Sequence, residues 1–137
     1  MTITDDELRQ LALDVTAKAQ EASKTRPTWV YMGYVGAALV TADGNVHTGV
    51  VVNLNCGIGF CAEHAAVAEM VKHGESRIER IAARTAGGAT LSPCGRCREM
   101  LAQIDVGNLD TTVLLPDDRS TQLRELLPDP WQPYWDG

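Results

Sequence analysis

The sequence has no apolar run long enough to cross a bilayer, and it has no excess of basic residues. Its 12 Lys and Arg residues are outnumbered by 18 Asp and Glu residues, which gives a formal net charge of −6. A transmembrane helix needs about 20 predominantly apolar residues, and binding to a phosphate backbone needs a surface rich in Lys and Arg. We therefore expect neither a membrane nor a nucleic acid as a partner.

We also expect no signal peptide at the beginning of the sequence. The first residues, Met1 to Glu7, are acidic and lack the basic start and apolar middle of such a segment. We expect a cytoplasmic protein, and a reducing compartment keeps thiols free. The four cysteines are therefore predicted to be metal ligands or catalytic groups before disulfides.

The 137 residues contain no internal repeat and no interdomain linker. With 45% hydrophobic and 22% charged residues, the composition is that of an ordinary globular protein. A chain of this length suits one domain with one modest core. We therefore predict a single domain over residues 1–137.

Hydrophobic periodicity predicts helices that alternate with strands. A capping box of Thr4 and Glu7 predicts the start of the first helix, and Asp43-Gly44 predicts a hairpin. The predicted helices cover residues 4–24, 62–73, about 94–106 and 123–127. The predicted strands cover residues 35–41, 46–52, 78–85 and 111–115, and residues 120–123 could pair back. This order predicts an α/β fold, a sandwich with helices on both faces of the sheet.

Three cysteines and one carboxylate form the candidate site. Cys61 and Glu63 fall at one predicted helix start, and Cys94 and Cys97 fall in the first turn of another. A catalytic zinc keeps three protein ligands and leaves a fourth position for water. In zinc deaminases a ligand-x-Glu motif is followed by Pro-Cys-x-x-Cys, and the Glu is the general acid and base. The sequence therefore predicts one Zn²⁺ per chain, bound by the three cysteines, with Glu63 as the catalytic residue.

The charge of this site needs compensation. Helix starts favour anions and should lower the pKa values of the thiols. Three thiolates on Zn²⁺ leave a net charge of −1, which should raise the pKa of a bound water. Arg96 lies between two of the predicted ligands and is the candidate for the compensating charge, with Arg98 as the second candidate.

Other readings of the same residues stay open at this point. Cys56 could supply a fourth sulfur, and a closed Cys₄ site would be structural, a zinc-stabilised module without catalysis. A redox Cys-x-x-Cys is disfavoured because the motif lies late in the chain, after a Pro. His64 is expected to point elsewhere on its helix and to pack or hydrogen-bond rather than to bind the metal.

At these motifs the chain resembles the cytidine deaminase superfamily, in its small single-domain branch. The resemblance implies a three-layer sandwich with a five-stranded mixed sheet, and a homotetramer. It also implies hydrolysis of a 4-aminopyrimidine nucleoside to the 4-oxo product, with substrate contacts from Asn53, Asn55 and Ala62. The stretches that carry the resemblance are Val35-Gly-Ala-Ala-Leu39, Gly49-Val-Val-Val-Asn53, Cys61-Ala-Glu63, Ser92-Pro-Cys-Gly-Arg-Cys-Arg98 and Arg124-Glu-Leu-Leu-Pro128.

The resemblance leaves the substrate less well determined than the chemistry. Asn55 stands where nucleoside deaminases usually carry a Glu that grips the ribose hydroxyls. Arg96 and the ending Tyr134-Trp-Asp-Gly137 are similar to blasticidin S deaminase, a branch that inactivates an antibiotic. By this analogy Trp131, Tyr134 or Trp135 could cover the pocket, or the aromatic tail could pack at an interface. The expected substrates are cytidine, deoxycytidine or a nucleoside-like antibiotic. The alternative, an enzyme of the same chemistry that edits a nucleic acid, would need a basic groove.

Overall fold

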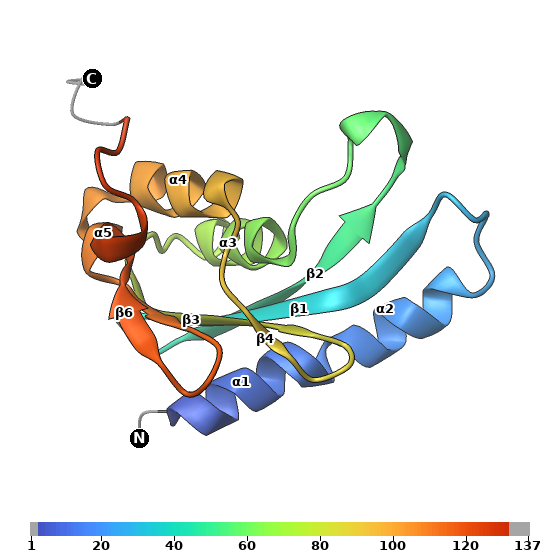
Figure 1. Ribbon diagram of the computed structural model, residues 1–137, viewed down its shortest axis with the longest axis horizontal. Coiled ribbons are helices and arrows are strands. Elements are labelled where there is room, and N and C mark those ends of the chain that lie inside the picture. The colour runs from blue at the N-terminus through green and yellow to red at the C-terminus, as the bar shows by residue number, and fades with distance from the viewer. Residues whose placement is uncertain (1–2, 132–137) are drawn as a thin grey trace.

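The computed structural model describes residues 3–131 as a mixed sheet with helices on both of its faces (Figure 1). Strands β3 and β5 are parallel, and every other recorded strand pair is antiparallel. The predicted α/β/α fold class is confirmed, and a short sixth strand, β4, adds to the five strands expected. The order is β2(Val46–Asn53), β1(Tyr31–Thr41), β3(Ile78–Thr85), β5(Thr112–Leu114), β6(Ser120–Gln122), with β4(Thr90–Leu91) beside β3.

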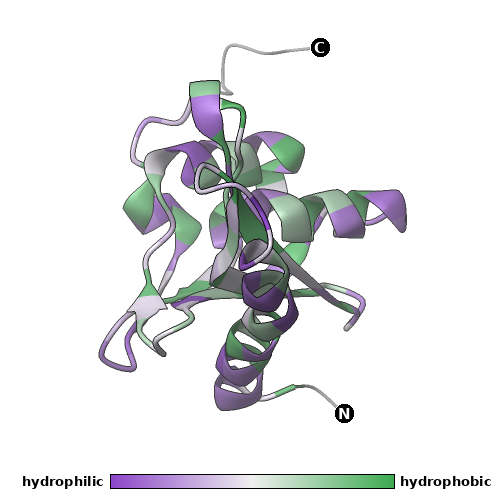
Figure 2. Ribbon diagram, turned by 90° about the vertical axis from the view of Figure 1, so that its right-hand side faces the viewer, coloured by the Kyte–Doolittle hydropathy of each residue, from purple (hydrophilic) through white to green (hydrophobic). Residues whose placement is uncertain are grey.

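The first predicted helix consists of two segments, α1 (Asp5–Asp14) and α2 (Thr16–Ser23). The capping box is present: the Glu7 backbone N–H donates to Thr4 Oγ1 at 3.1 Å, and the Thr4 N–H donates to Glu7 Oε2 at 2.9 Å. Leu8 is fully buried because the apolar stripe of the helix lies against the sheet. The outer face of α1 is hydrophilic (Figure 2).

The two cores lie on opposite faces of the sheet because successive side chains of a strand point to opposite sides. Along β1, Ala37 and Leu39 join the core beneath α3 and α4, whereas Ala38 and Val40 join the core beneath α1. All four are fully or almost fully buried. This explains the continuous apolar run that β1 shows in the sequence.

Helices α3 (Ala62–Lys72) and α4 (Gly95–Ile104) lie together on the face opposite α1 (Figure 1). Helix α3 packs along β2 at very short range, and Gly49 makes this approach feasible. A Cβ atom at Gly49 would lie 2.6 Å from the Ala65 Cβ and 2.7 Å from the Ala62 carbonyl oxygen. This contact holds the start of α3 against β2. The candidate site residues Cys61 and Glu63 are therefore held at the same place.

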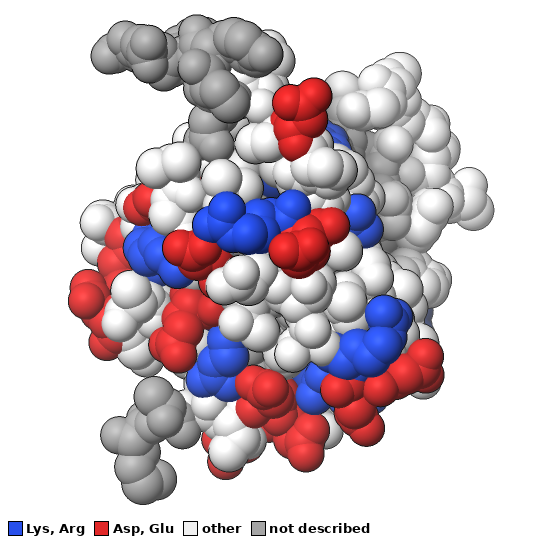
Figure 3. Space-filling model, turned by 60° about the vertical axis from the view of Figure 1, so that its left-hand side comes forward, with Lys and Arg blue, Asp and Glu red and all other residues white. Residues whose placement is uncertain are grey.

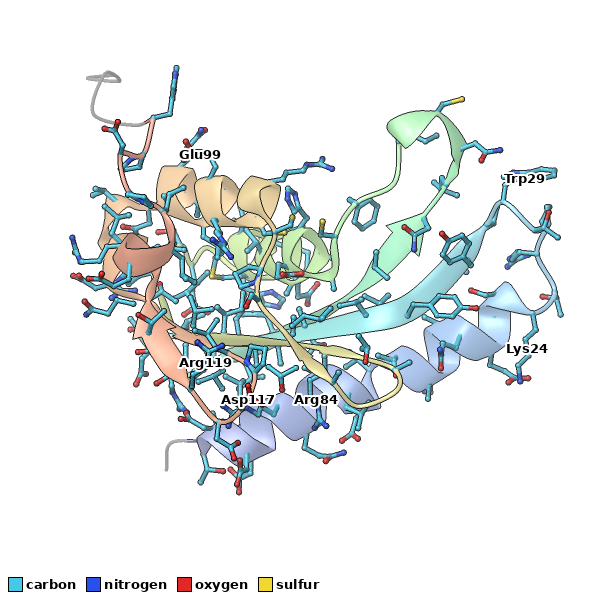
Figure 4. All side chains as sticks on the ribbon, viewed as in Figure 1. Lys24, Trp29, Arg84, Glu99, Asp117 and Arg119 are labelled. Atoms are coloured by element: carbon cyan, nitrogen blue, oxygen red, sulfur yellow. The ribbon has the colours of Figure 1, made fainter. Side chains whose placement is uncertain are left out.

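Strand β1 begins at Tyr31, four residues earlier than predicted. Its early part contains Gly33 at φ +79° and a register shift between Met32 and Gly36. The sequence pattern missed this part because Gly33 and the exposed Tyr31 and Tyr34 lie outside the continuous apolar run that marks the rest of the strand. Trp29 before β1 is exposed and lies at the end of the molecule away from Glu99 of α4 (Figure 4).

The C-terminal elements close the other end of the sheet. They are the 3₁₀ helix η2 (Val106–Asp110) and α5 (Leu123–Leu126). The buried Asn108 side chain links them to the core, because it accepts a hydrogen bond from the Ile78 N–H at 2.8 Å and donates to the Leu101 carbonyl at 3.0 Å. Over residues 3–131, none of the helices combines the length and the apolar character that crossing a membrane requires.

Candidate metal and active site

Cys61 is the N-cap residue of α3. The preceding loop, which includes the 3₁₀ helix η1 (Asn55–Gly57), returns to the sheet through a bridge between Val52 and Phe60. Both backbone hydrogen bonds of this bridge measure 3.0 Å. The bridge therefore places Cys61 beside the end of β2, at the point where the chain enters α3.

Cys94 is the N-cap residue of α4, and Cys97 lies in the first turn of the same helix. The Cys94 Sγ is 3.7 Å from the Cys61 Sγ and 3.5 Å from the Cys97 Sγ. A ligand atom of Cys61 also lies within 4.8 Å of one from Cys97. The starts of α3 and α4 thus bring together the three cysteines that the sequence motifs selected.

The sulfur positions fit a tetrahedral zinc centre. Zn–S bonds of about 2.3 Å at the tetrahedral angle place two sulfurs about 3.8 Å apart. The distances from the Cys94 Sγ to the Cys61 Sγ and to the Cys97 Sγ agree with this within a few tenths of an ångström. All four cysteines are free, and cysteine thiolates are among the ligands that zinc prefers. Zn²⁺ therefore fits this set of side chains.

Glu63 is the second residue of α3, and only 5% of its surface is exposed. Burial raises the pKa of its carboxyl group, an effect that its own backbone N–H and the Cys97 thiol partly offset. A raised pKa suits a group that must both take up and release a proton near neutral pH. A cavity of about 10 Å³ touches Glu63 on the side of the sheet, which is room for about one water molecule.

The helix starts do not act equally on the three thiols. Burial opposes ionisation of Cys94, but hydrogen bonds from the Cys97 backbone and side chain lower its pKa overall. Burial raises the pKa values of both Cys61 and Cys97, and the Glu63 carboxylate adds to this effect. The expected lowering is therefore confined to Cys94. Binding of a metal requires the thiolate form and so releases protons from cysteines that are still protonated.

His64 lies closer to the sulfurs than its place in the sequence suggested. A ring nitrogen of His64 is within 4.8 Å of a ligand atom of both Cys61 and Cys97. Its Nε2 is buried without a hydrogen-bond partner among the described residues. The expectation that His64 points elsewhere was wrong, because it considered only α3, whereas Cys97 approaches from α4.

Arg96 and Arg98 occupy different environments. Arg96 is exposed. Burial of His64 is the main cause that lowers the pKa of its imidazole, and the positive charge of Arg96 is the second cause. The Arg98 Nε donates to the Pro93 carbonyl at 2.8 Å, and its Nη1 donates to the Leu126 carbonyl at 3.1 Å. Arg98 therefore ties the end of α5 to the segment that carries Cys94.

The predicted substrate contacts lie on the β2 side of the site. Asn53 ends β2 and is half-buried, Asn55 is exposed in η1, and Ala62 is buried as the first residue of α3. Cys56, the alternative fourth sulfur ligand, is exposed in η1. Within the described part of the chain, it belongs to neither cluster of potential metal ligands.

The aromatic tail is described only up to Trp131. The Trp131 backbone N–H donates to Glu99 Oε1 at 3.0 Å, and its side chain is half exposed. This contact holds the beginning of the tail over α4. Tyr134 and Trp135, the other two residues suggested as a cover for the pocket, lie outside the described residues.

Comparison with known proteins identifies relatives of the whole arrangement. Residues 3–112 match the family described as the cytidine and deoxycytidylate deaminase zinc-binding region. The cytidine deaminase of Mycobacterium tuberculosis is 38% identical over 96 residues, which cover 69% of this chain and 70% of that protein. The cytidine deaminase of Sporosarcina psychrophila is 31% identical over 123 residues, covering 85% of this chain and 90% of that protein.

Solved structures of similar proteins share the fold. A crystal structure of a mutant cytidine deaminase from M. tuberculosis gives a TM-score of 0.74 at 32% identity, and covers 94% of this chain and 98% of that chain. The cytidine deaminase of Burkholderia pseudomallei gives a TM-score of 0.69 at 30% identity, covering 94% of this chain and 100% of that chain.

Proposed function

The chain belongs to the cytidine and deoxycytidylate deaminase family, and we propose that it removes the 4-amino group of cytidine or deoxycytidine by hydrolysis. Membership of this family makes the chain a zinc-dependent hydrolytic deaminase. The products of the proposed reaction are the 4-oxo nucleoside and ammonia. The observation that carries the proposal is the buried Glu63 beside three converging cysteine sulfurs.

Cys61, Cys94 and Cys97 are the proposed ligands of the zinc ion. The ion supplies a Lewis acid that makes water nucleophilic near neutral pH. Three thiolates reduce the charge of the centre, and Arg96 and His64 are the groups whose charge or N–H could offset it. Arg96 lies on α4 and His64 lies on α3, and these two helices also position the sulfurs.

Glu63 is the proposed proton carrier. It takes a proton from the attacking water and passes it to the ring nitrogen N3. It then takes the proton of the new 4-hydroxyl group and gives it to the 4-amino group, which leaves as ammonia while the 4-oxo group forms. Burial raises the pKa of Glu63, so protonated and ionised forms are closer in free energy than for an exposed carboxylate. The proposed contacts to the substrate are Asn53, which ends β2, Asn55, which begins η1, and Ala62, which begins α3.

A substrate panel with ammonia release as the readout tests this function. We expect turnover of cytidine, of deoxycytidine or of both, and loss of turnover in Glu63→Gln under the same conditions. Blasticidin S belongs in the panel because Asn55 replaces the usual Glu. If blasticidin S alone is turned over, the proposed substrate is wrong, but the proposed reaction, a hydrolytic deamination, stands. No turnover of any 4-aminopyrimidine nucleoside would refute the proposal.

A free nucleoside is favoured over a base within a nucleic acid. The net charge is −6, and on the face in Figure 3 the Lys and Arg side chains alternate with Asp and Glu. Such a surface repels a phosphate backbone or binds it weakly. Salt-sensitive binding of single-stranded oligonucleotides would contradict this part of the proposal.

The proposed assembly is a cytoplasmic homotetramer. Supporting it, four large aromatic side chains are exposed around the early part of β1 and the end of the loop before α3, namely Trp29, Tyr31, Tyr34 and Phe60. Exposed apolar groups gathered in one region are typical of protein interfaces. Light scattering after gel filtration tests it, because a mass near that of one chain would exclude the tetramer.

A further inference from the structure

A second cluster of potential metal ligands lies at the far end of α3 from Cys61. His47, Glu69 and His73 each offer one ligand atom, and these three atoms all lie within 4.8 Å of one another. At about 1.5 Å per helical residue, the end of α3 is about 15 Å from its beginning. The cluster is therefore separate from the three cysteines and contains none of the residues of the proposed reaction.

Local geometry and close packing bring these three side chains together. Glu69 and His73 are four residues apart at the end of α3, so they lie on the same face of the helix. His47 is the second residue of β2 and is only 7% exposed. The imidazole centroids of His47 and His73 are 5.1 Å apart. The site thus joins the start of β2 to the end of the helix that packs on it.

Each imidazole already has one nitrogen fixed by an oxygen that can only accept. His47 Nε2 lies 3.2 Å from Glu75 Oε1, and His73 Nδ1 lies 2.9 Å from the Glu69 carbonyl oxygen. Neither oxygen carries a hydrogen at neutral pH, so these two nitrogens must be the N–H donors. In a neutral imidazole with this tautomer, the other ring nitrogen carries the lone pair that a metal needs. Metal-binding histidines are usually held by such an N–H bond to a carboxylate or carbonyl.

The Glu75 side chain that holds His47 is itself fixed. Its Oε1 accepts from Asn45 Nδ2 at 3.2 Å, and only 13% of the Glu75 side chain is exposed. His47, Glu69, His73 and Glu75 line the same open hollow of about 600 Å³, together with Asp43. An incoming ion therefore meets a negatively charged recess rather than a closed core.

One cation already lies near the cluster. Lys72 Nζ is 3.2 Å from Glu69 Oε2, whereas Glu69 Oε1 faces His73 Nδ1 at 3.7 Å. Lys72 is 68% exposed, and exposed ion pairs of this kind add little stability. A divalent ion would thus compete with a weak partner for this carboxylate.

We propose that His47, Glu69 and His73 bind a second divalent transition-metal ion, such as Zn²⁺, with water completing its coordination. Two imidazoles and one carboxylate are ligands that zinc accepts, whereas magnesium and calcium prefer oxygen ligands alone. The site binds more weakly than the cysteine site, because Glu69 and His73 are partly exposed. The ion fixes the end of α3 to the start of β2 and so stabilises the folded chain.

Metal counting tests the site directly. Zinc-loaded protein is dialysed to equilibrium against micromolar free Zn²⁺, and zinc per chain is measured. We expect two ions in the wild type, one in His73→Ala and one in Glu69→Gln. Lys72→Met is the matched control, because it removes the neighbouring charge but no ligand, and it keeps two. One ion in the wild type, or two in both ligand variants, would overturn the proposal.

Cobalt spectroscopy separates the new site from the cysteine site. Co²⁺ added to the zinc-loaded wild type should give weak visible bands without the intense near-ultraviolet absorption of thiolate–cobalt bonds. These bands should be absent in His73→Ala, which keeps the deaminase activity because His73 takes no part in the proposed reaction. Thiolate–cobalt absorption, or unchanged visible bands in His73→Ala, would mean that the ion binds elsewhere.

Discussion

Gly49 of β2 lies so close to Ala65 of α3 that a Cβ atom added to the glycine would be 2.6 Å from the Ala65 Cβ. Carbon atoms in contact stay about 3.5–4.0 Å apart. Helix α3 carries Cys61 at its start and His73 just past its end. Gly49 therefore sets the distance between the sheet and α3. Both metal clusters depend on this distance, because each includes residues at one end of α3.

Replacing this glycine should damage both stability and activity. Gly49→Ala is expected to lose about 1–3 kcal/mol of unfolding free energy, because it overpacks a closed contact. The Cys61 and Glu63 side chains should also shift, so that kcat falls. Urea titration and initial rates measure the two effects. Gly87→Ala is the control, since its added Cβ would meet one atom at 3.8 Å, and equal losses in both variants would contradict the argument.

Glu63→Gln should retain the fold and the zinc while losing activity. The amide has nearly the shape of the carboxylate but cannot carry a proton, and general acid–base catalysis contributes about 100-fold or more. Zinc content and thermal unfolding should match the wild type within error, and kcat should fall by at least this factor. Turnover at the wild-type rate would remove Glu63 from the mechanism.

Cys94→Ser should release the zinc of the cysteine site and lower the unfolding temperature. The Cys94 Sγ lies 3.7 Å from the Cys61 Sγ and 3.5 Å from the Cys97 Sγ. Binding of a metal to such a ligand set contributes to the free energy of folding. Zinc retained after dialysis against a weak chelator is the measurement. Cys56→Ser is the matched control, because Cys56 is an exposed free cysteine of η1 and is not one of the three cysteines whose sulfurs converge. Equal zinc loss in the two variants would contradict the assignment of ligands.

Glu75→Gln should destabilise the protein near neutral pH but not in acid. Hydrogen bonds from Thr41, His47 and Asn45 lower the pKa of Glu75 below its ordinary 4.5. The folded state therefore favours the ionised carboxylate, and this stabilisation is present above pH 4.5 and lost as the pH falls through the lowered pKa. The difference in unfolding temperature between variant and wild type should shrink between pH 7 and pH 3. A difference that stays constant would mean that the charge of Glu75 contributes nothing.

Local features of the chain were predictable from the sequence because they depend on neighbouring residues. The Thr4–Glu7 capping box, the apolar run of β1 and the position of Cys61 and Cys94 at helix starts all follow from short patterns. The cysteine and carboxylate motifs also selected the side chains that the structure brings together. Short motifs are sufficient here because helix caps and zinc ligands impose fixed spacing on the chain.

Contacts between distant segments were decided only by the tertiary structure. His64 meets Cys97 across two helices, Asn108 reaches Ile78 across 30 residues, and His47 meets His73 because β2 packs under α3. The two-residue β4 and the irregular start of β1 also depend on the neighbouring strands that pair with them. No local pattern encodes such pairs, because their free energy comes from the packing of the whole core, which brings together residues that are remote in the sequence.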